Sequence, residues 1–497
     1  MPTGSLRLIV PPTSQLTPQA AEQAYMAGPE QIPWPCRTRL QHGELIVERN
    51  VADSGKFYIP WPVEGHGRLM LSTATLMQRD RPYQLAVELA RGKLNQVRGQ
   101  IADWQAIGLV VPGKVENAMH KALESLSLAV TSQHDVARAA AFAQKAIVLG
   151  LDAAELLVAS YTDQALAARH RSGQKLQTLF GANLGQHALE MPLLAYYLRA
   201  FNAAHVPLSW RAVEAVEGVY QWQLPDQQIA ACQENKLTVC AGPLVQLDAG
   251  GIPDWLYLWE DDFNSILSFV TDFAEKAVVR YQGKVDVWQC AARINVGDGL
   301  SLTEEQRLRL AARTIEVAQD VDPRTPLVVR FDQPWAEYMG RAAADFSPLH
   351  FADALVRSGL KLTAVAIEIN MGYQPGGSYP RDRLEFSRLL DLWSYLGLPL
   401  HVTLTVPGVE SSPPAGRGRA APVPQTFPGG WSPENQAAWI KHYVPLLLSK
   451  PAVHAIFWNQ LFDGEAEEFV AGGLLDPAGK PKPALTALTG LHRKHFD

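Results

Sequence analysis

The chain contains few cysteines and no excess of basic residues. Its four cysteines, Cys36, Cys232, Cys240 and Cys290, occur without CxxC spacing, which favours buried thiols over disulfides or a metal site. The formal net charge is −6, whereas a nucleic-acid-binding protein needs a basic surface. The sequence therefore predicts neither a nucleic-acid partner nor a metal centre.

Several familiar sequence motifs are also missing. The chain has no apolar window of about twenty residues that could span a membrane. Residues 1–10 lack the charged start and the cleavage site of a signal peptide. A Gly-rich phosphate loop, an HExxH motif and a G-x-S-x-G elbow are absent as well. We therefore expect a cytoplasmic protein without a cofactor, a metal or a membrane partner.

The composition is that of a globular protein with many loops. The chain has 497 residues, of which 47% are hydrophobic, with 37 Gly and 35 Pro. This length exceeds one ordinary core, so we expect two or three domains. The 13 tryptophans would suit a protein that stacks sugar rings on indole faces, although tryptophan is also ordinary core material.

Residues 1–83 alternate short β-rich runs with Pro, Gly and Asp-Ser-Gly turns. This pattern predicts a small β-sandwich-like module, similar to a carbohydrate-binding module. Trp34, Tyr58 and Trp61 would form either a sugar-stacking face or the aromatic core of a docking domain.

Residues 84–175 have a helical pattern instead. Apolar residues such as Leu85, Leu89 and Trp104 recur at mostly three- and four-residue spacing. We expect helices over residues 84–107, 113–131, 134–149 and 153–171. They would form a helical linker segment that packs beside the domain that follows, residues 176–497.

In residues 176–497, apolar runs that resemble buried strands alternate with amphipathic helices. Such strands imply a parallel sheet that is covered on both faces, and about eight strand and helix units close into a (β/α)8 TIM barrel. The fold class is therefore α/β. The predicted strands cover residues 179–183, 206–210, 237–247, 285–294, 327–332, 364–370, 400–406 and 453–459.

The connection after the seventh predicted strand is unusually long. Residues 407–430 are rich in Pro and Gly and contain Arg417 and Arg419. A loop at this position would lie over the barrel mouth. It would serve either as a lid or partner contact, or as an insertion without a role.

Several short stretches in the barrel region resemble glycoside hydrolase family 10, the xylanase family. The resemblance extends over about 310 residues and implies a catalytic TIM barrel. The matching stretches are Phe180-Gly181-Ala182-Asn183, Ser209-Trp210, Gly242-Pro243-Leu244-Val245, Arg280-Tyr281, Gly283-Lys284-Val285, Trp288, Asp322-Pro323, Leu398-Pro399-Leu400 and Trp458.

The residues that carry the family's reaction are replaced. Enzymes of this family use one carboxylic acid as acid/base and one carboxylate as nucleophile. The acid/base would close the stretch Trp288 to Arg293, where this chain has Arg293 itself. An arginine stays protonated at working pH and cannot act as a general acid and base. The nucleophile position corresponds to Leu404, so the family's mechanism does not carry over.

Two carboxylates remain at predicted strand ends. Asp332 and Glu368 end consecutive strands, and neighbouring strands lie about 4.8 Å apart. The two side chains could therefore serve together as relocated catalytic carboxylates. Alternatively, Arg293 pairs with one of them and only neutralises a buried charge. The remaining rim and pocket residues are predicted ligand contacts: Asn183, Trp210, Arg293, Asn295, Trp335, Glu337, Tyr338, Asn370, Tyr373 and Trp458.

Three functions are compatible with these residues. The first is a catalytically degenerate family 10-like barrel, a pseudoenzyme that binds an oligo- or polysaccharide or acts as a scaffold. The second is a glycosidase that uses Asp332 and Glu368. The third is an assembly protein that contacts a protein partner, or a second copy of itself, through residues 407–430.

Overall fold

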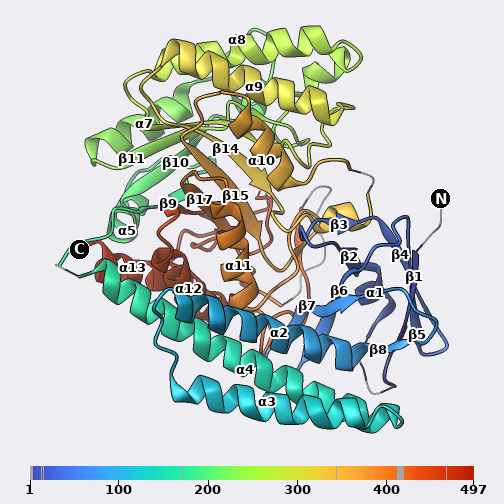
Figure 1. Ribbon diagram of the computed structural model, residues 1–497. Coiled ribbons are helices and arrows are strands. Elements are labelled where there is room, and N and C mark those ends of the chain that lie inside the picture. The colour runs from blue at the N-terminus through green and yellow to red at the C-terminus, as the bar shows by residue number, and fades with distance from the viewer. Residues whose placement is uncertain are drawn as a thin grey trace.

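The structure is a computed structural model, which describes residues 4–12, 14, 16–171, 173–342, 344–410, 419–465 and 467–497. It contains an N-terminal β module, a group of long helices and a barrel, in this order along the chain (Figure 1). Within these residues, no helix is long and apolar enough to cross a membrane.

The β module consists of two four-stranded sheets that pack face to face around a shared core. Tyr58 and Trp61 are 6% and 2% exposed, so both belong to the interior and neither presents a stacking face. The first sheet contains β4 (Cys36–Gln41), β5 (Glu44–Arg49), β1 (Gly4–Ile9) and β8 (Tyr83–Gln84). The second contains β3 (Pro33–Trp34), β2 (Tyr25–Ala27), β6 (Gly55–Val63) and β7 (Gly67–Leu76), and α1 spans Pro18–Glu22.

Three long helices follow the β module: α2 (Leu85–Ala106), α3 (Gly113–Thr131) and α4 (Val136–Arg169). The sequence predicts two helices, over residues 134–149 and 153–171, where α4 forms a single one that includes Gly150. An added Cβ at this glycine would be 2.8 Å from Cδ1 of Leu94. The glycine therefore allows close packing of α4 on α2 and does not end the helix.

Gly92 places α2 directly against the β module. An added Cβ would be 2.1 Å from the backbone oxygen of Ser72 in β7. We expect Gly92→Ala to destabilise the protein by about 1–3 kcal/mol through overpacking. Gly99→Ala is the matched control, because an added Cβ there would have no atom within 4 Å apart from the neighbouring backbone of its own helix, and alanine favours a helix by about 0.5–1 kcal/mol. Urea denaturation should give opposite signs, and equal effects would refute this packing.

Eight parallel strands among the described residues close into a ring, in which β19 pairs back with β9. This confirms the predicted α/β TIM barrel, with helices around it, preceded by small sheets and a helical segment. The ring contains β9 (Leu179–Asn183), β10 (Ala203–Pro207), β11 (Thr238–Gly242), β13 (Val287–Ala292), β14 (Leu327–Asp332), β15 (Ala364–Asn370), β17 (Leu400–Thr405) and β19 (Val453–Trp458).

Helices surround this ring, and short strands and turns lie at its mouth. The longer helices are α5 (Leu193–Ala200), α7 (Gln223–Glu234), α8 (Phe263–Tyr281), α9 (Glu304–Val321), α10 (Pro348–Arg357), α11 (Arg383–Ser394), α12 (Pro433–Ser449) and α13 (Pro483–His495). The short elements are α6 (Trp210–Val213), β12 (Val245–Gln246), η1 (Asp254–Trp259), η2 (Glu337–Gly340), β16 (Tyr373–Gln374) and β18 (Ala421–Pro422).

Two predicted strand boundaries are wrong. The second strand was expected at residues 206–210, but β10 ends at Pro207 and Trp210 begins α6. The third was expected to run through residues 237–247, but it breaks between β11 and β12. Pro243 lies at this break, and its missing N–H cannot continue a ladder of hydrogen bonds.

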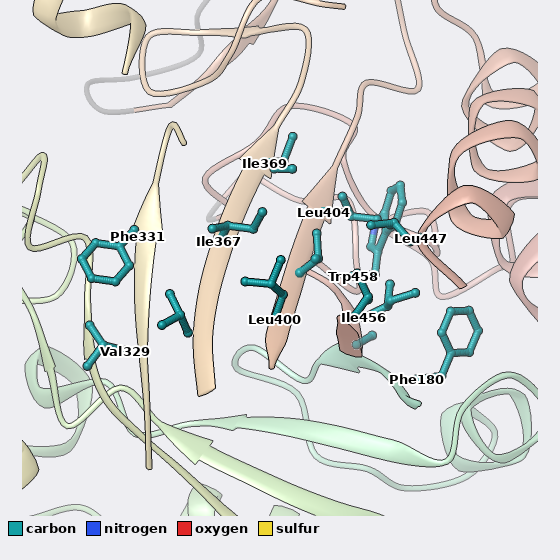
Figure 2. Close-up of a cluster of buried hydrophobic side chains, with 14 of the residues drawn as sticks. Phe180, Val329, Phe331, Ile367, Ile369, Leu400, Leu404, Leu447, Ile456 and Trp458 are labelled. Atoms are coloured by element: carbon teal, nitrogen blue, oxygen red, sulfur yellow. The ribbon is translucent and has the colours of Figure 1, made fainter. Parts of the chain in front are cut away.

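Side chains alternate along each barrel strand between the interior and the surrounding helices. In β14, Val328 joins an interior cluster made only of strand residues, whereas Val329 and Phe331 join the outer core with the helices. Figure 2 shows this outer core, in which Trp458 lies with Leu404 and Leu447. Trp458 and Leu404 thus point outward, away from the barrel axis.

The β module docks on loops of the barrel. The backbone N–H of Met70 in β7 donates to the oxygen of Pro380, at 2.8 Å. Lys93 of α2 forms a 2.8 Å ion pair with Asp382, and both side chains are almost fully buried, at 2% and 1% exposure. These contacts fix the N-terminal parts to the segment between β15 and α11.

Part of the long loop after β17 folds onto the barrel mouth. β18 pairs with β16, from the loop after β15, and Glu410 accepts hydrogen bonds from the N–H groups of Gln425 and Trp431. Residues 411–418, including Arg417, lie outside the described residues. The lid or partner-contact role of residues 407–430 therefore stays a prediction.

Candidate functional site

Arg293 follows β13, the fourth strand of the barrel. The pairing of β13 with β14 shifts in register between Gln289 and Ala291, and such a bulge changes the direction of the side chains beyond it. Arg293 has a φ of 55°, a left-handed conformation that costs a non-glycine residue about 1–2 kcal/mol. The bulge and the turn direct the guanidinium across the mouth of the barrel.

The Arg293 guanidinium is the centre of an ion-pair network. It contacts Glu368 at 2.5 Å, Asp248 at 2.6 Å and Glu468 at 2.9 Å. The Arg293 side chain is only 7% exposed. Burial alone would lower the pKa of Arg293, but the surrounding carboxylates outweigh this and raise it well above the usual value. Arg293 is therefore a fixed cation, and of its two predicted partners, Asp332 and Glu368, it pairs with Glu368.

Glu368 is sealed inside this network. It is 0% exposed. Its Oε1 accepts from Arg293, from Nδ2 of Asn370 at 2.8 Å and from Nδ2 of Asn459 at 2.9 Å, and its Oε2 lies 3.2 Å from Nε of Arg330. Burial favours the neutral acid, but the two arginines dominate and hold the pKa of Glu368 well below its usual range. Glu368 is thus an ionised group that cannot reach a ligand.

Asp332 lies next to Glu368 in register across β14 and β15, as the sequence predicts. Burial, followed by the negative charge of Glu368, raises the pKa of Asp332 well above its usual value. Its Oδ1 accepts the backbone N–H of Gln333 at 2.8 Å. Asp332 therefore keeps its proton in conditions in which an exposed aspartate is ionised, whereas Glu368 is charged.

Asp332→Asn should stabilise the protein at pH 8 and have little effect at pH 4. A carboxyl whose pKa is raised in the folded state binds more protons folded than unfolded, so stability falls as pH rises above the unfolded pKa of about 3.9. Asparagine removes this loss and keeps an oxygen for Gln333. Melting temperatures at both pH values test this, and a lower melting temperature of the variant at pH 8 would disprove a protonated Asp332.

Two cavities meet above this network, at the carboxyl ends of the strands. The larger has a volume of about 950 Å³ and is lined by Asp248, Asn295, Asp332 and Tyr338, among others. The smaller, about 310 Å³, is lined by residues that include Asn183, Trp210 and Arg330. Arg293 and Glu468 line both cavities. This is the face of a TIM barrel where ligands bind.

Some predicted ligand contacts line these cavities, and others lie in the protein interior. Asn295 holds Asp332 in place, because it donates to the Asp332 backbone oxygen and accepts from its N–H. Asn370 lies below the cavities, bound to Glu368. The predicted residues on the cavity walls are Asn183, Trp210, Arg293, Asn295, Asp332 and Tyr338.

The other predicted contacts are occupied by the protein itself. Trp458 is 2% exposed and donates to the oxygen of Gly472, and Tyr373 is 0% exposed and donates to the oxygen of Val470. Glu337 pairs with Arg381, whose guanidinium lies 4.5 Å from the ring centre of Trp335. Trp335 and Glu337 thus secure the loop after β14, and none of these four faces the two cavities.

Sequence reasoning missed Asp248, Arg330 and Glu468. Arg330 is two residues before Asp332 in one strand, so the period of two places both inside the barrel. Asp248 directly follows the third predicted strand, which is a position where barrels carry functional groups. Glu468 belongs to an irregular loop, and no sequence pattern marks it. Among the described residues, no group of His, Cys, Asp and Glu side chains could hold a metal ion.

No family model matches the chain, and no curated protein matches it. Among solved structures, the chain is similar to xylanase 10B from Thermotoga petrophila RKU-1 in complex with xylobiose, at 16% identity and a TM-score of 0.49, over 67% of this chain and 97% of that chain. Native xylanase 10B from Thermotoga maritima matches at 16% identity and a TM-score of 0.48, with the same two coverages. A GH10 protein from Paenibacillus barcinonensis matches at 17% identity and a TM-score of 0.48, over 66% and 97% of the two chains.

Proposed function

We propose that this chain is a catalytically degenerate family 10-like barrel, which binds an oligo- or polysaccharide at its mouth without hydrolysing it. The main support is the state of Glu368, which is 0% exposed and bonded through both oxygens, with one bond to Arg293, a residue that lines a cavity of about 950 Å³. Glycoside hydrolysis needs a carboxylate that reaches the sugar. Here a sugar could enter the cavity, but the Glu368 carboxylate is buried and could not reach it.

The larger cavity offers the groups that sugar recognition requires. Tyr338 supplies a half-buried aromatic ring at its wall, and Asp248 and Arg307 supply charged hydrogen-bonding groups. Sugars combine apolar ring faces with many hydroxyls, so an aromatic wall beside polar side chains is a suitable surface. Trp458, which the family resemblance places in a sugar pocket, does not contribute because it faces the outer core.

Calorimetric titration with xylo- and cello-oligosaccharides tests this function, together with an assay for released reducing ends. We expect binding without hydrolysis. Tyr338→Ala should weaken binding by about tenfold, equivalent to about 1.4 kcal/mol. Tyr395→Ala is the matched control, because Tyr395 is 86% exposed at the end of α11. Absence of binding to every sugar, or an equal effect of both variants, would reject the proposal.

A glycosidase that uses Asp332 and Glu368 is the second candidate. Its support is that the two neighbouring carboxyls have opposite pKa shifts, with Asp332 raised and Glu368 lowered, as an acid and a nucleophile require. A broad glycan hydrolysis screen decides between the two candidates. Activity that Asp332→Asn and Glu368→Gln both abolish would replace the binding function with this one.

A further inference from the structure

The contact between Arg293 and Glu468 has the geometry of a bound carboxylate ligand. Nη1 of Arg293 donates to Oε1 of Glu468 at 2.9 Å, and Nη2 donates to Oε2 at 3.0 Å. Two parallel bonds of this kind are how arginine recognises a carboxylate. The Glu468 side chain is 41% exposed, whereas that of Glu368 is 0% exposed. Of these two carboxylates on Arg293, Glu468 is therefore the one that can exchange.

Arg293 would keep its position if Glu468 left. Nε and Nη2 of Arg293 donate to Glu368, at 3.3 Å and 2.5 Å, and Nη1 donates to Asp248 at 2.6 Å. Glu368 lies in β15, the sixth strand of the barrel, and Asp248 follows β12, whereas Glu468 belongs to the loop after β19. The guanidinium would thus remain a preorganised site for a second carboxylate, with little conformational cost of binding.

Only the side chain of Glu468 has to move. Its backbone oxygen accepts the N–H of Ala420 at 2.9 Å. The next residue, Phe469, is 0% exposed, and its N–H donates to Oε1 of Gln460 at 3.0 Å. On the other side of the side chain, Nε of Arg419 donates to the backbone oxygen of Glu467 at 2.8 Å, so the loop backbone is anchored before and after Glu468. A rotamer change of Glu468 is fast for an exposed side chain. It would expose Nη1 and Nη2 of Arg293, here called the fork of Arg293, to the cavities.

The charges on the cavity wall favour an acidic replacement for Glu468. The larger cavity is lined by four arginines: Arg211, Arg293, Arg307 and Arg419. It is also lined by five acidic residues: Asp248, Asp298, Asp332, Glu467 and Glu468. With Asp332 protonated, the positive and negative charges are equal in number. Removal of Glu468 leaves one excess positive charge, which a ligand carboxylate would neutralise.

We propose that the barrel mouth selects oligosaccharides that carry a uronic acid, whose carboxylate displaces Glu468 from the fork of Arg293. This inference rests on the proposed binding function and adds the class of sugar. Arg293 and Glu468 line both cavities, so a sugar chain that occupies the two must pass this pair. Glu468 then acts as an internal substitute for the ligand, which keeps the edge formed by Nη1 and Nη2 of Arg293 paired while the site is empty.

A matched pair of ligands tests the selection. One is a xylo-oligosaccharide with a glucuronic acid branch, and the other is the same molecule with its carboxyl reduced to an alcohol. We expect the wild-type protein to bind the acid at least about tenfold more tightly in calorimetric titration. Glu468→Ala should tighten binding of the acid by about a further tenfold, with little effect on the reduced ligand, because the competing carboxylate is removed.

Two further variants distinguish the effect of the paired hydrogen bonds of Arg293 from the effect of net charge at the cavity rim. Glu467→Gln removes a negative charge from the same rim, where its carboxylate contacts His187, and should tighten acid binding less than Glu468→Ala does. Arg293→Lys keeps the charge but loses the fork, so preference for the acid should fall. Equal binding of the two ligands, in the wild type and in Glu468→Ala, would overturn this inference and leave the binding function intact. Failure of both ligands to bind either protein, together with absence of binding to the xylo- and cello-oligosaccharides, would overturn both proposals.

Discussion

Arg293→Met is expected to lower the free energy of unfolding by about 3–5 kcal/mol at pH 7, because it leaves buried carboxylates without their main partner. Glu368 is 0% exposed and would keep Arg330 as a cation. Asp248, at 17% side-chain exposure, would lose its 2.6 Å contact. Methionine fills a similar volume, so the loss reflects charge and not a cavity.

The pH dependence of this loss identifies its origin. In the variant, the pKa of Glu368 rises because one of its two arginines is gone. Protonation of Glu368 below that raised pKa then relieves its repulsion with Asp248 and Glu468. The deficit relative to the wild type should therefore shrink as the pH is lowered from 7 toward 4. Urea denaturation at several pH values measures it.

Arg211→Met is the control for Arg293→Met. Arg211 lines the same cavity but is 42% exposed and pairs with Asp254, which is 76% exposed. An exposed pair of this kind contributes about 0–1 kcal/mol. Equal losses for the two variants, or a loss for Arg293→Met that does not depend on pH, would show that the network around Arg293 is not what stabilises the barrel mouth.

Lys93→Met is expected to cost about 3–5 kcal/mol as well, because it leaves Asp382 buried without a cation. In the wild type, burial raises the pKa of Asp382, but Lys93 and local hydrogen bonds outweigh this and lower it. Asp382 also caps α11, since its side chain accepts the N–H of Leu384. The double variant Lys93→Met with Asp382→Asn keeps that cap without the charge, and should recover most of the loss.

Lys450→Met is the matched control for Lys93→Met. Lys450 is 4% exposed, but its partner Asp391 is 42% exposed, so water can solvate the carboxylate once the lysine is gone. We expect a loss of about 1 kcal/mol or less from the ion pair. If Lys93→Met were as mild as Lys450→Met in urea denaturation, the interface between α2 and the barrel would not depend on the buried pair.

The barrel strands were predictable because each is a short apolar run with a polar end. The bounds of β14 and β15 agree with the sequence prediction residue for residue, and the adjacency of Asp332 and Glu368 follows from them. Trp458 and Leu404 were misplaced because family resemblance gives a position in the chain but not a direction. The period of two places both in the outer core.

The charge network was predictable only in part. A pairing of Arg293 with either Glu368 or Asp332 follows from the cost of an isolated buried charge. Its contact with Glu468 does not, because that residue is about 175 positions away and lies in an irregular loop. The bulge in β13 that directs Arg293 also leaves no mark in the sequence, since Cys290 and Ala291 continue the apolar strand pattern. Tertiary contacts decide both features.

The burial of Lys93 against Asp382 has a consequence for dissecting the chain into fragments. The sequence changes character near residue 176, which invites expression of the barrel alone. A fragment that starts there would lack Lys93 and would expose the surface on which Met70 and Tyr25 rest, including Arg381, which donates to the Tyr25 hydroxyl. A buried ion pair and hydrogen bonds thus cross the boundary between residues 4–175 and the barrel. For recombinant work and for domain shuffling alike, we expect a fragment of residues 176–497 to be less stable than a protein that keeps residues 4–175 as well.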